Sequence, residues 1–599
     1  MSYIELEKGA NYDPTGKALR NWINAIGDLK TIAIEDVGVA TLENGSGLFN
    51  NLQNLTDVDM FNTNTSNVTT IANLFYNCKN LVNISNFDTY NTTKMNYAFY
   101  NCQKLQIIPN IDTNRVDNMS FMLYGCSNLV TVPNFNTSNV TSMIHTFANC
   151  SNINTIPNLN TEKVDNMAGI FRNCVNLVNI PNISTIAVTN AGYMFLNCRN
   201  LVSVPKLNFY NVMNLEQIFA DCKSLTSMPE LVIGNNSTLY GAFSGCDNLT
   251  SVSNLDYSNV VNTNVMFQGC TNLTEISNLN FANTKDAEGM FSSCNNLTTV
   301  TNVTLPKTNY VNGMFSYCNK LRTINGLHIG MTSAVNNAYY MFAYCQNLTT
   351  INNFYLNVAP TGNMANMFYY YYNLPIQTIT NTTLIGPTYR LFHDMNRLEL
   401  LDNMTFNNCD MTYMFDSCGN LSTITNITVS NMNYYRSLSA TFRYCVKLTS
   451  VPNFDTSDIT YMSRTFEECW NLVSIPNFDM SNVDTTYYMC FNCRNITTVP
   501  TFNTSKLTNS SAMFYGCNNL VNVPILDLSN VVDMSLMFSQ CNNLSVESLS
   551  NIANSVPNVN KLNTSMRNIA TIGITPDRFG PGDLTVLNTK GYLDCLLPA

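Results

Sequence analysis

The feature that most constrains this chain is a repeat of 24 residues. The segment Phe147 to Ile170 (FANCSNINTIPNLNTEKVDNMAGI) is followed directly by a second version of itself, from Phe171 to Met194, and a third version spans Phe466 to Met489. A fixed period of this length is typical of solenoid proteins, in which each unit buries its apolar face only by stacking on its neighbours. The sequence therefore predicts a stack of coils and not a set of globular domains.

The register of the repeat is set by an aromatic mark. Taking Phe as position 1, we find 21 units, with marks from Phe49 to Phe538. Eleven successive marks, from Phe75 to Phe315 and with Leu123 in place of one Phe, are 24 residues apart, whereas the marks between Phe315 and Phe466 are unevenly spaced. Position 7 is Leu or Ile in every unit. Positions 7 to 13 predict a short strand, which Pro at position 11 shortens in several units. Apolar residues at positions 18, 21, 24 and 1 predict a helical or 3₁₀ turn on the opposite side.

The repeat resembles a known family. The pattern F-x-x-C-x-N-L-x-x-[IV]-P-N-[FL]-[DN]-T-S-x-V-x-x-M, as in Val132 to Met143 and Val451 to Met462, is similar to the BspA-like leucine-rich repeats. Within that family it is most like the Met- and Cys-containing repeats in surface proteins of mycoplasmas, Firmicutes and their phages. The resemblance covers roughly residues 47–545, although these units are slightly shorter than the family's usual repeat. It implies a solenoid with a recognition or surface role, and it carries no catalytic residues.

The predicted fold is an α/β, leucine-rich-repeat-like solenoid of about 21 coils. Short parallel strands form one face, helical or 3₁₀ turns form the other, and both ends are capped. We expect three regions: residues 1–47 form an N-terminal cap or anchor, 48–545 the solenoid, and 546–599 a C-terminal helical cap and tail. The first region predicts a helix over 17–27 and a strand over 31–42.

The C-terminal region has its own pattern. Apolar residues on one face predict a helix over Val546 to Val556, and a second helix is expected over Leu562 to Ile572. The cluster of Pro and Gly from Pro576 to Gly582 predicts a turn-rich tail. A terminal segment of this kind is what the last coil of a solenoid requires as cover.

Cysteine occupies position 4 in 18 of the 21 units. These cysteines could form disulfides, bind a metal, or form a column of buried free thiols, which behave as small apolar side chains. Parallel side chains in register bridge poorly, and one Cys per unit makes no metal cluster, so we predict the reduced column. Cys409, Cys490 and Cys595 lie outside it. The predicted column consists of Cys78, Cys102, Cys126, Cys150, Cys174, Cys198, Cys222, Cys246, Cys270, Cys294, Cys318, Cys345, Cys418, Cys445, Cys469, Cys493, Cys517 and Cys541.

Tyrosines gather where the repeat loses its phase, in residues 321–445. Insertions in a solenoid usually map to loops on one face, which is often the binding face. Tyr is also enriched at interfaces, although it fits strands equally well. We predict partner-binding residues at Tyr339, Tyr340, Tyr344, Tyr355, Tyr369, Tyr370, Tyr371 and Tyr372.

Composition excludes several functions. Charged residues make up 11% of the chain and the net charge is −10, which disfavours nucleic-acid binding. The three histidines, His145, His328 and His393, lie far apart in the sequence, and no catalytic triad, metal-ligand set or phosphate loop is present. We therefore predict a protein that is not an enzyme and that needs no cofactor or metal.

The predicted function combines these points. No signal peptide or transmembrane segment is seen, which would fit a virion protein released by lysis. We therefore predict a bacteriophage tail or fibre protein that recognises a bacterial surface glycan or protein, with residues 1–47 joining other virion proteins. A bacterial cell-surface adhesin for host matrix or glycans is the first alternative, and a structural decoration of the virion is the second.

Overall fold

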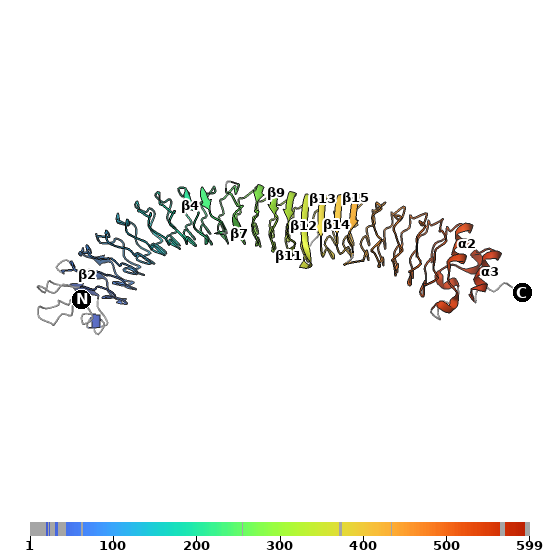
Figure 1. The fold of residues 1–599 in the computed structure, drawn as a ribbon, viewed down its shortest axis with the longest axis horizontal. Coiled ribbons are helices and arrows are strands. Elements are labelled where there is room, and N and C mark those ends of the chain that lie inside the picture. The colour runs from blue at the N-terminus through green and yellow to red at the C-terminus, as the bar shows by residue number, and fades with distance from the viewer. Residues whose placement is uncertain are drawn as a thin grey trace. The chain divides into compact units, whose positions relative to one another are not determined.

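The computed structural model describes residues 20–21, 23, 30–33, 43–60, 64–235, 237–253, 255–369, 374–432, 434–562 and 569–592. The chain divides into two compact units, residues 1–297 and 298–599. Figure 1 shows that each unit is a succession of narrow coils that follow one another in sequence order. All strand pairing between the described residues is parallel. The predicted solenoid class is therefore confirmed.

The strands of the first unit are short. Most contain two or three residues and pair with one neighbour, and many coils are joined by single bridges such as Asn166↔Asn190. The named strands are β1 (Thr31–Ala33), β2 (Asp57–Asp59), β3 (Asn83–Ile84), β4 (Leu207–Phe209), β5 (Leu231–Ile233), β6 (Ser237–Thr238), β7 (Val260–Asn262) and β8 (Glu275–Asn280).

The second unit contains the longest strands. They lie side by side in the green-to-orange part of Figure 1, where β12 pairs with β10 on one side and with β13 on the other. In chain order they are β9 (Thr299–Leu305), β10 (Thr323–Ile329), β11 (Val335–Asn337), β12 (Thr350–Asn363), β13 (Thr378–Ile385), β14 (Leu400–Asn407) and β15 (Thr423–Ser430).

Proline explains where strands form. Three coils with Pro at position 11, namely Pro157, Pro181 and Pro476, contain no named strand on this face, because Pro cannot donate to the ladder. The coils with Pro205 and Pro229 form only the three-residue strands β4 and β5, which begin after the Pro. The coil that begins at Phe267 has Ser277 at position 11 and forms the six-residue strand β8. Counted by pairing, the solenoid has about 16 turns, slightly fewer than the 21 units of the sequence.

The opposite side of each coil differs from the prediction, because it is built from β-turns and not from helical turns. In the coil marked by Phe75, the amides of Phe75 and Asn77 donate to carbonyls of the next coil, at 2.8 and 2.6 Å. The amide of Tyr76, which lies between them, donates to the carbonyl of Asn73, three residues back along the chain. The residue two before position 1 and the residue at position 3 are left-handed in almost every coil, as at Asn73 (φ 58°) and Asn77 (φ 61°). A right-handed helix cannot contain them.

Identical side chains form continuous columns in the core. Phe rings at position 1 stack with centroids 5.1–5.8 Å apart, for example Phe195 on Phe219 and Phe442 on Phe466. Position 7 is fully or almost fully buried, as at Leu177. Because every coil supplies the same apolar shapes, each coil buries the face of the next.

Polar side chains form ladders as well. Thr at position 15 is buried, and the Oγ1 atoms of Thr89, Thr137 and Thr161 each donate to a backbone carbonyl of the next coil at 2.8 Å. At position 3, Asn173 and Asn197 donate to the Asn of the preceding coil at 2.6 and 2.9 Å. Asn suits this position because it tolerates left-handed backbone.

The C-terminal cap contains one predicted helix and one unpredicted helix. Helix α2 (Val546–Ser555) matches the prediction and buries Leu549, Ile552 and Ala553. The predicted turn-rich tail instead holds the 3₁₀ turn η4 (Pro576–Arg578) and helix α3 (Pro581–Thr589), since Pro is favoured at the first position of a helix. Lys590 caps α2 by donating to three carbonyls near its end, including that of Ala553 at 2.9 Å.

The rest of the caps is described only in part. The helix predicted over Leu562 to Ile572 is represented by the 3₁₀ turns η1 (Val559–Lys561) and η3 (Ile569–Ile572), and residues 563–568 lie outside the described residues. Ile572 accepts a hydrogen bond from the amide of Phe538 at 2.8 Å, so this segment continues the ladder over the last coil. At the other end, β1 confirms the start of the predicted strand, and most of the predicted helix over 17–27 lies outside the described residues.

Candidate binding surface

The turn side of the second unit carries a row of aromatic and arginine side chains, which we call the turn ribbon. Its members occupy the residues just before position 1 or at positions 2 and 3, where side chains of successive coils lie next to each other. The ribbon consists of Tyr317, Tyr339, Tyr340, Tyr344, Tyr369, Tyr389, Arg390, Tyr413, Arg443, Tyr444, Arg464, Tyr487, Tyr488, Phe491 and Tyr515.

Four of the eight predicted tyrosines lie together in this ribbon. Tyr344 stacks on Tyr317 with centroids 4.4 Å apart, and it meets the ring of Tyr369 edge-on at 5.8 Å. Tyr340 lies against both Tyr339 (5.1 Å) and Tyr369 (5.7 Å). Tyr317 was not predicted because it lies just before residues 321–445, the stretch in which the tyrosines cluster.

The other predicted tyrosines fall elsewhere. Tyr355 lies in β12 on the strand side, where its ring is 6.5 Å from that of His328, so it does not join the turn ribbon. Tyr370, Tyr371 and Tyr372 lie outside the described residues.

Extra residues of the longer coils lie at one corner of the coil. The pairing of β11 with β12 passes from Val335↔Val358 to Asn337↔Asn363, so β12 contains residues without partners in β11. The Oη of Tyr435, from a later long coil, donates to the carbonyl of Pro360 at 3.1 Å. The insertions therefore meet each other and fix this corner, beside the turn ribbon and not within it.

Three arginines alternate with the tyrosines of the ribbon. The guanidinium of Arg390 lies 5.4 Å from the ring centre of Tyr389 and 4.8 Å from that of Tyr413. Arg443 lies 5.1 Å from Tyr413 and 5.3 Å from Tyr444. Arg464 continues the row against Tyr487 and Tyr488, at 5.2 and 4.9 Å. Stacking between a guanidinium and the face of a ring is attractive and holds both groups in place.

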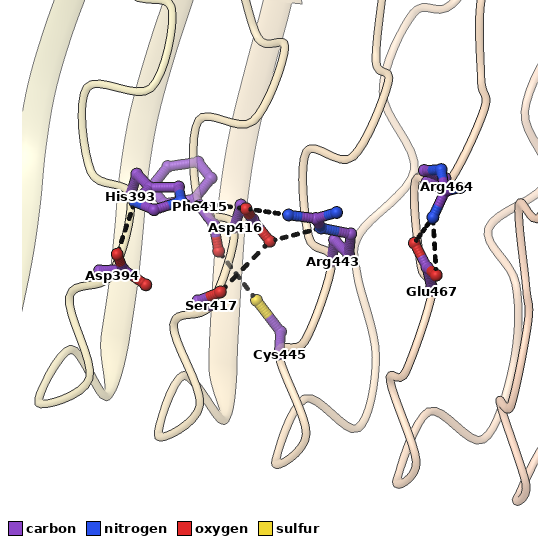
Figure 2. A network of polar contacts seen from close by, with 9 residues as sticks. All are labelled: His393, Asp394, Phe415, Asp416, Ser417, Arg443, Cys445, Arg464 and Glu467. Atoms are coloured by element: carbon purple, nitrogen blue, oxygen red, sulfur yellow. Dashed lines mark hydrogen bonds and ion pairs between the residues drawn. The ribbon is translucent and has the colours of Figure 1, made fainter.

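Two of these arginines are neutralised inside the protein, as Figure 2 shows. Asp416, whose side chain is fully buried, accepts from Nε and Nη2 of Arg443 at 2.8 and 2.7 Å. It also lies 3.1 Å from Nε2 of His393, whose Nδ1 is 2.9 Å from a carboxylate oxygen of Asp394. Arg464 pairs with Glu467 at 2.9 Å.

The charge state of Asp416 follows from these contacts. Burial by itself would raise the pKa of this carboxyl. The hydrogen bonds from His393 and Arg443 and their positive charge outweigh burial and hold the pKa of Asp416 below its ordinary value. Ser417 Oγ is 3.4 Å from Asp416, so the only hydroxyl drawn in the network contacts the acid and not the imidazole. The arrangement orders charge and lacks the nucleophile–base contact of a hydrolase.

The backbone beneath the ribbon is strained. Arg390, Tyr413 and Arg464 have φ of 55–61° at the residue two before position 1, where other coils have glycine, as at Gly289 and Gly313. A left-handed conformation is unfavourable for large side chains and concentrates at sites that use the side chain. Glycine and Asn at these two turn positions are the signal that could have revealed the turns from sequence.

The first unit has an aromatic row at the equivalent place. Tyr76, Tyr100 and Tyr124 stack in succession at 4.7 and 4.8 Å, and Tyr97 stacks on Phe121 at 4.7 Å. Among the described residues of this unit, Arg172, whose guanidinium lies 5.8 Å from the ring centre of Tyr193, is the one cation that contacts a ring of this row. The first unit therefore offers rings with little positive charge.

The cysteines lie in the core, away from the ribbon. The 20 described cysteines are free and buried, and Cys409 and Cys490 are among them, whereas Cys595 lies outside the described residues. Thiols of the column donate to the position-1 carbonyl of the preceding coil, for example Cys174 to Phe147 at 3.1 Å. Burial raises the pKa of Cys126 and Cys174 to about 12, so these thiols are protonated at neutral pH. Among the described residues, no group of three potential metal ligands is formed.

Parallel coils, a turn on one side and columns of identical core residues define a leucine-rich-repeat type of solenoid. The chain belongs to the family described as "Mycoplasma protein of unknown function, DUF285", whose profile matches residues 20–130, 43–154, 125–230, 237–355, 307–381, 409–522 and 436–552. The resemblance to BspA-like surface repeats is thereby confirmed. No curated protein matches the sequence.

Solved structures with low overall similarity include bacterial and animal proteins. A leucine-rich repeat protein from Eubacterium ventriosum is 16% identical, with 58% of this chain and 85% of that chain covered and a TM-score of 0.22. A leucine-rich cell surface protein from Faecalibacterium prausnitzii is 14% identical (84% and 80% covered, TM-score 0.15). The Drosophila Toll–Spätzle complex gives 13% identity (89% and 64%, TM-score 0.26). With TM-scores this low, the fold assignment depends on the strand pairing. In the part of the chain that the structure describes, no helix has the length and apolar character to cross a bilayer.

Proposed function

We propose that this protein is a cell-surface binding protein without enzymatic activity, and that it holds a macromolecular ligand on the turn ribbon of its second unit. Membership of a family of surface repeats supports the surface location. It favours the adhesin alternative over a bacteriophage tail or fibre protein, for which the comparisons offer no support. The ligand is a glycan or a protein of another cell or of its matrix.

The turn ribbon is the observation that carries this proposal. Interfaces are enriched in Tyr and Arg, and residues of these two types dominate binding energy when they are held rigidly. In the ribbon, rings and guanidinium groups stack on each other and rest on a hydrogen-bonded backbone. A ligand would therefore meet a surface that loses little conformational entropy on binding.

The experiment is a binding assay with the purified chain under reducing conditions. Two panels are used: immobilised animal matrix proteins and mucins, and intact low-GC bacteria. The double variant Tyr389→Ser/Tyr444→Ser removes two rings that are 50% and 42% exposed. Its matched control is Tyr461→Ser, a 49% exposed tyrosine of the same unit outside the ribbon.

We expect saturable binding by the wild-type chain and a loss of at least tenfold in affinity for the double variant, with the control unchanged. Matrix or mucin binding would support the adhesin, whereas binding confined to a few bacterial strains would restore the receptor-binding virion protein. Binding that the double variant retains in full would refute the ribbon as the binding surface.

A further inference from the structure

We propose that Arg390, which lies against the rings of Tyr389 and Tyr413, binds the carboxylate of an acidic sugar in an extended polysaccharide that lies along the turn ribbon. This inference depends on the proposed function and specifies its ligand class. It starts from a difference between Arg390 and the other two arginines of the ribbon.

Arg390 is exposed, and its guanidinium lies against the rings of Tyr389 and Tyr413, which themselves meet edge-on. None of the described residues gives it an ion pair or a side-chain hydrogen bond. Arg443 donates to Asp416 through Nε and Nη2, and Arg464 donates to Glu467 through Nη1, so both guanidinium charges are paired with a carboxylate. Arg390 is therefore the arginine of the ribbon whose N–H donors remain available for a ligand.

The chemistry of a free guanidinium selects the ligand group. Its planar fork matches the two oxygens of a carboxylate. The rings of Tyr389 and Tyr413 meet edge-on with their centroids 6.1 Å apart, and the guanidinium lies against both of them, which restricts where the fork can lie. The acids nearby do not compete for it, because Asp394 is occupied by His393 and Asp416 is buried beneath Arg443.

The spacing of the coils favours a polysaccharide over a peptide. Parallel strands place equivalent side chains about 4.8 Å apart, which is close to the length of one hexose in an extended chain. A peptide strand repeats its side chains on one face about every 6.6 Å and falls out of step with the coils within a few residues. Successive sugars would meet one coil each. One of them would place its carboxylate at Arg390, and the apolar faces of its neighbours would lie against the exposed edges of Tyr389 and Tyr444.

The net charge of −10 does not prevent this contact. At physiological ionic strength, charges more than about 8 Å apart are largely screened, so the local groups decide. Around Arg390, Asp394 contacts His393 and Asp416 contacts Arg443, so neither carboxylate pairs with the guanidinium of Arg390. Binding should weaken as salt is added.

The test uses the full chain and a fluorescent oligogalacturonate, in which every sugar carries a carboxylate. The fully methyl-esterified oligomer is the neutral probe, and poly-glutamate of similar charge is the peptide probe. Arg390→Gln removes the free guanidinium. Arg397→Gln is the matched control, because it removes another exposed arginine of the same coil that lies outside the ribbon.

We expect the oligogalacturonate to bind the wild type at least tenfold more tightly than the methyl ester or poly-glutamate does. Arg390→Gln should lose at least tenfold in affinity, and Arg397→Gln less than twofold. Equal binding of the ester, tighter binding of poly-glutamate or full binding by Arg390→Gln would each overturn the proposal. If matrix or cell binding still depends on Tyr389 and Tyr444 in that case, the proposed function stands and only the ligand class is wrong.

Discussion

Replacing Arg443 by Met leaves the buried carboxylate of Asp416 without its main partner. The wild-type pair has two hydrogen bonds, of 2.7 and 2.8 Å, and the Asp416 side chain is fully buried. Breaking a buried pair by removing one partner costs about 3–5 kcal/mol, because the remaining charge stays desolvated. Since His393 still donates to Asp416, we expect a loss near the lower limit, about 3 kcal/mol.

The double variant Asp416→Leu/Arg443→Met tests the reason for this loss. With both charges removed, no uncompensated carboxylate remains, and we expect it to be at least about 2 kcal/mol more stable than Arg443→Met alone. Stability is measured by urea unfolding with circular dichroism, together with hydrogen exchange of peptides from residues 413–445. A single variant that loses less than about 1 kcal/mol, or a double variant no more stable than it, would refute the reasoning.

The pH dependence gives an independent check. Because the folded-state pKa of Asp416 lies below its unfolded value of about 3.9, its contribution to stability is complete above that pH and disappears as the pH falls through the folded pKa. In Arg443→Met the carboxyl loses two hydrogen bonds and the positive charge of the guanidinium, so its pKa rises. The difference in unfolding free energy between wild type and variant should therefore shrink as the pH is lowered towards 4.

Three other predictions address the backbone, the thiols and the ribbon. Gly386→Ala should lower the unfolding free energy by about 3 kcal/mol, because φ is 108° and the new Cβ would lie 2.2 Å from the carbonyl oxygen of Val358. Gly582→Ala in α3, with no atom within 4 Å, should instead gain about 0.5–1 kcal/mol, and thermal unfolding compares the two. Iodoacetamide at pH 8 should leave the 20 described cysteines unmodified in the folded chain and should alkylate them in urea. The mass of the intact protein counts the modified cysteines, and modification of these cysteines in the folded chain would contradict their burial. Tyr344→Ala should cost about 1–2 kcal/mol in urea unfolding through its contacts with Tyr317 and Tyr369, and an unchanged midpoint would show that the stack contributes nothing.

The apolar columns could be predicted from the sequence because buried positions are occupied by apolar residues at a fixed spacing. Phe at position 1 and Leu at position 7 lie in the core, and α2 follows its amphipathic pattern. The prediction of helical turns on the turn side was wrong, because the spacing of apolar residues carries no information on the sign of φ. Left-handed residues such as Asn73 and Asn77 convert the same spacing into β-turns.

Only part of the turn ribbon could be predicted from the sequence, because the pattern of residue types does not show which residues of different coils become neighbours. Tyr344 and Tyr369 were found because they cluster in sequence, but Arg390, Arg443 and Asp416 belong to different coils. Their proximity depends on the coil length in an irregular stretch, where the marks are not 24 residues apart. A repeat alignment that places these residues in one turn column would have revealed the stack.

The ladder of Thr side chains has a consequence for how such a gene changes length. Each Thr at position 15 binds the same carbonyl of the following coil, at 2.8 Å for both Thr137 and Thr161. Suppose that recombination removes or duplicates one complete 24-residue repeat within residues 1–297. The coils that become neighbours then present the same atoms to each other, and each Thr hydrogen bond forms again. An insertion or deletion of a single residue within a strand would instead turn the following side chains of that strand to the opposite face. Selection can therefore lengthen or shorten the molecule in steps of one complete coil, and this moves surface groups along the axis by whole rungs without redesign of the core.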